Sequence, residues 1–451
     1  MSTRLLIILL LCIIALQLPA QDKSKAKFGN VTEDDFKQTV YSIDSNANAV
    51  VIADIGSTEI VGNDKGNFSL QFKKFTRIHI LNKNGYDAAK IEIGIYTNED
   101  QEEKLNSLKA VTYNLENGKI TETKLDKDNV FKVKISKHLI LKKFTLPNIK
   151  EGCIIEFQYE ILSDFIFNLQ PWEFQGNYPR LWSEYKVDIP SFYRFITLSQ
   201  GYQPFFIKSN KDGSGVYTVT DLNGTQATEH TTFTTGTTLY RWVMKDVPAL
   251  KEENYTSTIN NHISRIEFQL SALAAPFNPK NVMASWPEAA TDLLKDEDFG
   301  ESLRKDNPWL NDFMPAAVNG AVNDLDKARN IFAWLRDNMT CTNHNRKYIE
   351  TSLKTVLKTR NGNEAEINLL LTDMLKKAGL NADPVILSTR SHGIVYALYP
   401  LLDRFNYVIT RLQVNNNDYY LDASQPGLGF GKLTNDVYNG HARVINESAT
   451  P

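Results

Sequence analysis

The sequence predicts an α+β protein in two parts, an N-terminal antiparallel β-sandwich region and a C-terminal α+β domain. Two observations support this. From residue 28 to 272, short segments alternate apolar and polar residues and are separated by turn dipeptides. From residue 275 to 451, helical periodicity takes over and further alternating segments follow it. A chain of 451 residues has room for both parts.

Residues 1–20 have the pattern of a signal peptide. Arg4 precedes an apolar run from residue 5 to 18, and small residues stand before Gln21. The run is short for a membrane span with flanks, although an uncleaved anchor is an alternative. We therefore expect an exported chain in the periplasm or cell envelope, with no transmembrane segment after cleavage.

The composition limits which partners the protein is expected to bind and which features stabilise its fold. The formal charge is −3 and contains no long run of one sign, so we expect no binding to nucleic acid. Beyond the leader only Cys153 and Cys341 remain, which are too few for a disulfide framework. A hydrophobic core must stabilise the chain, and 42% hydrophobic residues can supply one. We expect no cofactor.

Turn dipeptides mark the hairpins of the β region. Asn117-Gly118 lies between two alternating segments and predicts a tight hairpin. Aromatic residues become dense between residues 165 and 195. Packing between two sheets explains this density most simply, and an exposed platform for carbohydrate or peptide is the alternative.

The C-terminal part has well-marked helix and hairpin signals. Asn323 is a good N-cap for one helix. Asn363 is another, and Glu366 completes its capping box, so a second helix begins at Glu364. Gly379 follows that helix where a left-handed cap is expected. Segments 405–414 and 418–421 then predict an antiparallel hairpin.

The stretch around the second helix resembles the transglutaminase-like superfamily. In that family the pattern Arg-x-Gly-x-Cys precedes a Leu-rich helix that ends at Gly. The matching positions are Arg360, Gly362, Leu369, Leu370, Met374, Leu375 and Gly379, and Glu364 stands at the cysteine position. The resemblance covers about residues 324–444 and implies a papain-like α+β core.

The resemblance also locates the other two members of the family's catalytic triad. The family's histidine opens the first strand of the final hairpin, and its aspartate follows the second strand. Those positions hold Asn406 and Asp422 in this chain, so only the aspartate is retained.

The β region resembles the uncharacterised β domain that precedes transglutaminase-like domains in many exported bacterial proteins. The resemblance is carried by residues 144–152, 156–159, Trp242 and 247–253, and it covers about residues 40–270. It implies a domain order and an envelope location, but no activity.

Acyl transfer by this family needs a thiolate, a histidine that moves the proton, and a group that orients the histidine. Attack by Glu364 on an amide would give an anhydride, and Asn406 cannot protonate the leaving amine. We therefore expect no catalytic residue among Glu364, Asn406 and Asp422. These three and Trp334 are instead candidate binding residues for a peptide, a glycan or an envelope protein. A plain structural role is also open for Glu364, because the helix dipole favours an acidic first turn.

Two further hypotheses remain open. Cys341 could pair with His344 or His392 in an active site outside the family positions, although the end of a helix disfavours a thiolate. We expect no zinc there, because a second ligand pair is missing from the sequence nearby. Alternatively, the protein is a structural scaffold whose cleft binds nothing.

Overall fold

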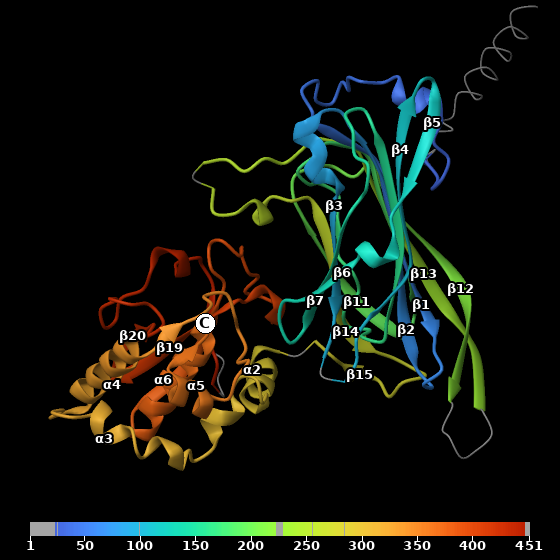
Figure 1. Ribbon diagram of the computed structural model, residues 1–451. Coiled ribbons are helices and arrows are strands. Elements are labelled where there is room, and N and C mark those ends of the chain that lie inside the picture. Colours follow the sequence, from blue (N-terminus) through green and yellow to red (C-terminus); the bar gives the residue numbers. More distant parts are fainter. Residues whose placement is uncertain are drawn as a thin grey trace, which may run out of the picture.

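A computed structural model describes residues 23–24, 26–98, 100–221, 229–254, 256–283 and 285–446. It has a large β-rich N-terminal part and a smaller α+β C-terminal part, which lie side by side (Figure 1). The predicted signal peptide, residues 1–20, lies outside the described residues. No helix in the described part of the chain combines the length and hydropathy of a membrane span.

An eight-stranded sheet forms the larger layer of the N-terminal part. Its order is β12-β13-β10-β1-β2-β8-β4-β5. The strands are β1 (Ala49–Gly62), β2 (Phe68–Ile80), β4 (Lys104–Glu116), β5 (Lys119–Lys124), β8 (Ile154–Ser163), β10 (Arg180–Pro190), β12 (Ile207–Asp221) and β13 (Glu229–Val247). β4 and β5 meet at Asn117-Gly118, where both residues have positive φ, so the predicted hairpin is confirmed. The pair β1 and β10 is parallel, unlike the antiparallel pairing expected throughout.

Two smaller sheets complete the β region. One has the order β3-β7-β6 and the other β11-β14-β15, with β9 beside β14. The strands are β3 (Lys90–Tyr96), β6 (Phe131–Lys134), β7 (Leu139–Thr145), β9 (Trp172–Glu173), β11 (Tyr193–Gln200), β14 (Arg265–Leu273) and β15 (Lys280–Asn281). One hydrophobic core joins them to the large sheet. The aromatic segment 165–195 supplies much of that core, since Trp172, Phe174, Tyr185 and Phe192 are buried. Packing therefore explains its aromatic density.

A segment before β1, residues 26–36, is fastened to the large sheet. Arg77 and Glu156 form a buried ion pair at 2.6 Å. Arg77 also donates to the carbonyl oxygens of Lys27 and Asn30, and the N–H of Gly29 donates to Glu156. Charge-assisted hydrogen bonds in a buried setting hold this N-terminal arm in place.

The C-terminal part packs helices on a four-stranded sheet of order β20-β19-β18-β21. The helices are α2 (Trp286–Lys295), α3 (Met314–Ala317), α4 (Asp324–Asn338), α5 (Leu353–Thr359) and α6 (Glu364–Lys377). The strands are β18 (Asn381–Leu387), β19 (Tyr407–Val414), β20 (Asn417–Leu421) and β21 (Ala442–Val444), and a short parallel pair joins β16 (Thr340–Cys341) to β17 (Asn361–Gly362). The expected hairpin is β19 and β20.

Helix α6 is the centre of this domain. It begins at Glu364, with Asn363 as N-cap and the full capping box to Glu366, as predicted. Gly379 has a φ of +81°, which confirms the expected left-handed cap. An amphipathic helix buries one face, but in α6 every residue from Glu364 to Leu375 is buried. The helix is covered all round because α4, α5, β18 and β19 surround it.

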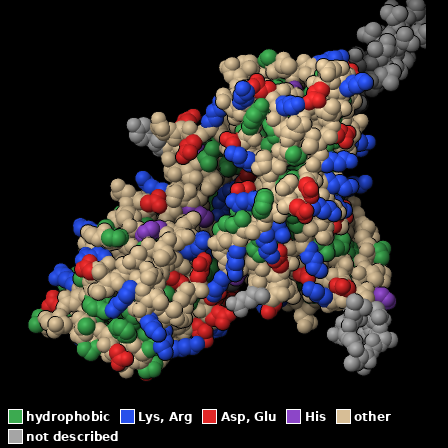
Figure 2. Space-filling view, in the orientation of Figure 1, with side chains coloured by type: hydrophobic (Ala, Val, Ile, Leu, Met, Phe, Trp, Pro, Cys, Tyr) green, Lys and Arg blue, Asp and Glu red, His purple; other side chains and the backbone are tan. Residues whose placement is uncertain are grey.

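Ion pairs connect the two parts of the molecule. Lys137 in the turn before β7 lies 2.5 Å from Asp298. Arg404, just before β19, pairs with Glu267 on β14. Positively charged and histidine side chains follow the junction in the space-filling view (Figure 2). A cleft of about 420 Å³ opens along it, between the β7 turn and the loop that precedes α5.

Candidate functional site

The first residue of α6 carries a carboxylate with no exposed surface. Glu364 accepts a hydrogen bond from the backbone N–H of Arg346, at 3.3 and 3.2 Å to its two oxygens. Burial raises the pKa of Glu364 well above its ordinary value of 4.5, the Arg346 contact opposes this, and the charge of Asp422 adds to it. The ionised form of Glu364, at the family's nucleophile position, is therefore disfavoured, and its side chain faces the protein interior.

The capping box holds the loop in front of α6. Glu366 accepts from the N–H groups of Glu350 and Thr351 at 2.8 and 2.7 Å, besides its bond to Asn363. A Cβ at Gly362 would lie 2.8 Å from Val356 and 3.0 Å from the Glu366 carboxylate. Glycine is therefore required at this turn, because the backbone passes close to both side chains.

Asn406 occupies the position where the family has its histidine. Its side-chain oxygen accepts from the N–H of Thr389 at 2.9 Å, and its amide nitrogen donates to the Thr389 hydroxyl at 3.0 Å. The same nitrogen donates to Asn345 at 2.5 Å. These three contacts fix the amide and leave it no proton to give to a substrate.

Asp422 follows β20 and is completely buried. Its carboxylate accepts from Asn368 at 2.9 Å, from the Tyr407 hydroxyl at 2.9 Å, and from the backbone N–H and hydroxyl of Ser424 at 3.0 and 2.6 Å. These four donors satisfy the hydrogen-bonding capacity of the carboxylate, which indicates a structural role for Asp422. Asn406 is not among these donors.

The three positions surround one region without touching one another. The loop that carries Asn345 and Arg346 lies between them, since Asn345 contacts Asn406 and Arg346 contacts Glu364. Only Asn406 reaches the cleft, because Glu364 and Asp422 have no exposed surface. The resemblance assigns the three positions to one site, and the structure shows that two of them face inward.

Both parts of the chain line the cleft. The β region contributes Tyr96 and His138, and the C-terminal part contributes Asp403 and Asn406. Its other titratable lining residues are Lys137, Asp296, Asp298, Arg346, Lys347, Glu350 and His392. Sequence reasoning identified His392 but not Lys347, His138 or Asp403, because none of these belongs to a recognisable motif. A site with both signs of charge suits a ligand that itself carries both.

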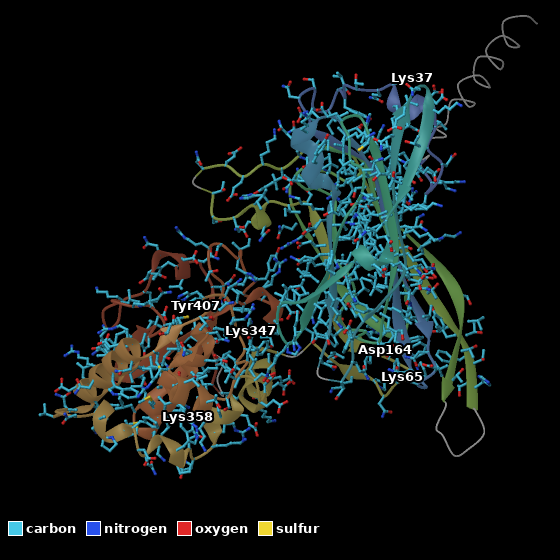
Figure 3. The ribbon with its side chains drawn as sticks, viewed as in Figure 1. Lys37, Lys65, Asp164, Lys347, Lys358 and Tyr407 are labelled. Atoms are coloured by element: carbon cyan, nitrogen blue, oxygen red, sulfur yellow. The ribbon has the colours of Figure 1, made fainter. Side chains whose placement is uncertain are left out.

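Lys347 is the most unusual of these side chains. It is only 6% exposed, donates to the carbonyl oxygen of Leu402, and lies 4.6 Å from the ring centre of Tyr348. Burial lowers its pKa to about 8, and the charge of Asp403 partly opposes the change. It lies on the side of the C-terminal domain that faces the β region (Figure 3).

Cys341 lies near His344, and His392 lies elsewhere. The Sγ atom is 3.5 Å from Nδ1 of His344, and it donates to the carbonyl oxygen of Asn343 at 3.3 Å. Burial raises the pKa of Cys341 to about 12, and the carboxylates of Glu364, Asp422 and Glu366 contribute. A thiol in this setting stays protonated, which is opposite to the activation that a nucleophile needs. Neither Cys341 nor His344 lines the cleft.

Trp334 lies away from the cleft. Its ring centre on α4 is 4.6 Å from the guanidinium of Arg360 and 6.3 Å from the ring of Phe313. Arg360 is the left-handed C-cap of α5, with a φ of +60°. The arginine of the family motif therefore packs on aromatic rings at the surface of the helical layer. Within the described residues, no group of three or more His, Cys, Asp or Glu side chains could hold a metal ion.

Comparison with known families supports both resemblances. Residues 312–421 match the transglutaminase-like superfamily. Residues 67–251 match DUF3857, a domain of unknown function with a solved structure. The C-terminal part is thus a transglutaminase-like domain and the N-terminal part a DUF3857 domain. No curated protein matches the chain.

One solved structure shares the whole architecture. It is the crystal structure of a "putative protease" from Parabacteroides distasonis, with a TM-score of 0.56 and 14% identity over 89% of this chain and 71% of that one. At this identity the likeness establishes the fold alone. An M1 zinc metallopeptidase from Deinococcus radiodurans matches with a TM-score of 0.18 and 10% identity, over 46% of this chain and 45% of that one. That likeness is too slight to support an argument.

Proposed function

We propose that this chain, a DUF3857 domain followed by a transglutaminase-like domain, is an exported cell-envelope protein that binds a peptide without hydrolysing it. The observation that carries the proposal is the contrast between the two sides of the family's active-site region. Glu364 and Asp422 are sealed inside, while Asn406 opens onto a charged cleft.

The buried side argues against acyl transfer through the family positions. Burial raises the pKa of Glu364 and so disfavours the ionised form that would have to attack, and attack on an amide would give an anhydride. Asn406 has no titratable proton, and its amide is already bound to Thr389 and Asn345. The transglutaminase-like domain is therefore catalytically degenerate in this proposal.

The open side argues for a peptide ligand. Asn345 is exposed in the cleft, and within the described residues its side-chain NH₂ has no hydrogen-bond partner, so it can donate to the carbonyl oxygen of a peptide backbone. Asp403 is exposed in the cleft, and its carboxylate has no hydrogen-bond partner among the described residues. Lys137 and Arg346 also line the cleft, where they form ion pairs with Asp298 and Glu350. Glycans and folded partner proteins are the other ligand classes that a binding assay must compare.

Binding can be tested with a panel of short peptides and neutral oligosaccharides, titrated against the mature chain. We expect a peptide to bind, and Asp403→Asn to weaken it because the substitution removes a charge from the cleft. Asp312→Asn is the matched control, since Asp312 is also exposed on the C-terminal domain and lies outside the cleft. Binding of no peptide, with the protein folded, would favour the scaffold hypothesis.

The competing enzyme hypothesis rests on the 3.5 Å contact between Cys341 and His344. It is tested by incubating the same peptides with the wild-type chain and with Cys341→Ala. The proposal expects no cleavage by either chain. Turnover that disappears in Cys341→Ala would establish a cysteine hydrolase and refute the binding-only function.

Export is tested separately. N-terminal sequencing of the protein from a cell-envelope fraction should begin at Gln21, which is the first residue after the expected leader. A chain that keeps residues 1–20 would instead indicate an uncleaved anchor.

A further inference from the structure

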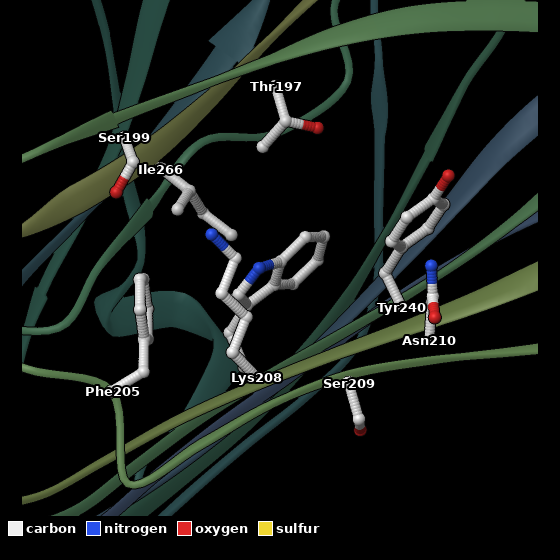
Figure 4. A pocket seen from close by; sticks show the side chains of 9 residues that line it. Thr197, Ser199, Phe205, Lys208, Ser209, Asn210, Tyr240 and Ile266 are labelled. Atoms are coloured by element: carbon white, nitrogen blue, oxygen red, sulfur yellow. The ribbon is translucent and has the colours of Figure 1, made fainter.

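A second cavity lies within the β region, far from the family positions in the sequence. It measures about 380 Å³ and opens between the edge of the large sheet and the smaller sheet that contains β11. The lining residues are Thr197, Ser199, Phe205, Lys208, Ser209, Asn210, Tyr240, Trp242 and Ile266. Figure 4 shows Lys208 between Phe205 and Tyr240, with Thr197 and Ser199 facing the same space. This size is within the range of small-molecule sites.

The register of β12 and β13 builds one wall. Lys208 is opposite Trp242, and Asn210 is opposite Tyr240. Residues two apart on a strand share a face, so two aromatic rings and two polar side chains point the same way. The rings of Tyr240 and Trp242 are stacked, with centres 5.5 Å apart and planes only 7° from parallel. Stacked rings partly cover each other, and Trp242 is almost fully buried, so the half-buried ring of Tyr240 is the aromatic surface that a ligand can reach.

That surface is held rigidly. Trp242 is only 3% exposed and packs edge-on against Phe268, with ring centres 5.8 Å apart. Phe205 stands at the side of the cavity, and the Lys208 ammonium lies 5.6 Å from its ring centre. A ligand would therefore meet a preformed wall, which lowers the entropy cost of binding.

The polar side chains around the wall are available to a ligand. Within the described residues, the side chains of Thr197, Ser199, Lys208 and Asn210 have no protein hydrogen-bond partner. Lys208 is the single charged residue of the lining, and no carboxylate opposes it. The cavity therefore combines an aromatic wall, a ring of hydroxyl and amide groups, and one uncompensated positive charge.

We propose that this cavity binds an acidic saccharide, one sugar ring packing on Tyr240, with Trp242 stacked behind it, while the sugar's carboxylate meets Lys208. A sugar ring has an apolar face of C–H groups that suits a flat aromatic surface. Its hydroxyl groups need both donors and acceptors, which Thr197, Ser199 and Asn210 supply. A carboxylate is the charge that one lysine can balance, whereas a nucleotide would bring several negative charges. The inference is independent of the peptide cleft.

Calorimetric titration of the mature chain with trigalacturonate, cellotriose and benzoate tests the assignment. Trigalacturonate should bind most tightly, because cellotriose lacks the carboxylates and benzoate lacks the hydroxyl groups. Lys208→Gln removes the charge but keeps a polar side chain that is only one bond shorter, and it should weaken the binding of trigalacturonate about tenfold. Lys211→Gln, on the same strand outside the lining, should not change it. Asp403→Asn in the other cleft should not change it either.

Three results would overturn the proposal. The first is no binding of trigalacturonate at millimolar concentration by the folded chain. The second is benzoate or cellotriose binding as tightly as trigalacturonate. The third is an unchanged affinity in Lys208→Gln. Tryptophan fluorescence tests whether trigalacturonate binds in this cavity and not at a distant site. The ligand should quench the fluorescence of the wild type and of Trp309→Phe, but not that of Trp242→Phe. The last variant keeps an aromatic ring in the wall of the cavity.

Discussion

The hydroxyl of Tyr407 donates to the carboxylate of Asp422 at 2.9 Å, so the aspartate at the family's triad position binds the residue next to Asn406 rather than Asn406 itself. Burial raises the pKa of Tyr407, and the negative charge of Asp422 raises it further. The phenol therefore stays protonated and remains a donor. This hydrogen bond therefore stabilises the interior of the domain.

Replacing Asp422 should cost stability. Asp422→Asn would turn an amide NH₂ toward at least one of four donors and leave a buried group unsatisfied. We expect a loss of about 2–4 kcal/mol in the free energy of unfolding. Chemical denaturation measures it, with Asp418→Asn as the control, because Asp418 is at the surface. An unchanged stability would contradict the structural role assigned to Asp422.

Glu364 should tolerate the loss of its charge but not of its side chain. Its pKa is raised, so the unfolded state ionises first as pH rises, and the charged form penalises the fold. Glu364→Gln imitates the neutral acid and should equal or exceed the wild-type stability at pH 8. Glu364→Ala leaves a cavity and should cost about 2–4 kcal/mol. Equal losses in both variants would contradict this account.

Cys341 should react slowly with thiol reagents. A pKa of about 12 against an ordinary 9.0 reduces the thiolate fraction about a thousandfold, and the greater nucleophilicity of a basic thiolate offsets part of this. We expect Ellman's reagent to label Cys341 roughly thirtyfold more slowly than a free cysteine peptide, measured in a Cys153→Ala background. His344→Ala should leave the rate unchanged. Rapid labelling that depends on His344 would instead indicate an activated pair.

Asp373 should make stability depend on pH. It lies inside α6, accepts a hydrogen bond from Asn307 at 2.6 Å, and burial raises its pKa to about 7. The folded state therefore binds this proton more tightly than the unfolded state, whose pKa is 3.8. Stability should fall as pH rises from about 4 to about 7 and then level off.

Asp373→Asn should remove the loss of stability that accompanies ionisation of Asp373. We expect it to be more stable than the wild type at pH 8, by roughly 2–4 kcal/mol, and to show a flatter pH profile between pH 4 and 7. Asp312→Asn, which is exposed on the same domain and is not among the charges that shift the pKa of Asp373, should keep the wild-type slope. A wild-type slope in Asp373→Asn would assign the titration to another group.

Local signals were enough to predict much of the fold. Asn363 and Glu366 specify the start of α6 through contacts three residues apart, and Asn117-Gly118 specifies a hairpin through its own backbone conformation. The parallel pairing of β1 with β10 joins segments more than a hundred residues apart, and no local pattern encodes it. The family pattern identifies Asn406 and Asp422 as the triad positions. Only the folded domain shows that Tyr407 and Asn368 donate hydrogen bonds to the carboxylate of Asp422.

The cleft was beyond sequence reasoning for a related reason. Its walls come from the turn at His138 and the loop at Lys347, which are joined by the docking of two domains. Neither turn contains a motif, and each has the polar composition of an ordinary loop. Trp334, the fourth candidate binding residue, packs against Arg360 and does not line the cleft.

The N-terminal arm, fastened by Arg77, leaves the β region at the end that carries β4 and β5, remote from the transglutaminase-like domain (Figure 1). A tether joined to the chain ahead of the arm would pull on the buried pair of Arg77 and Glu156 before it pulled on the junction between the domains. The molecule could thus be immobilised by that end on a bead or sensor with both cavities left facing the surrounding solution.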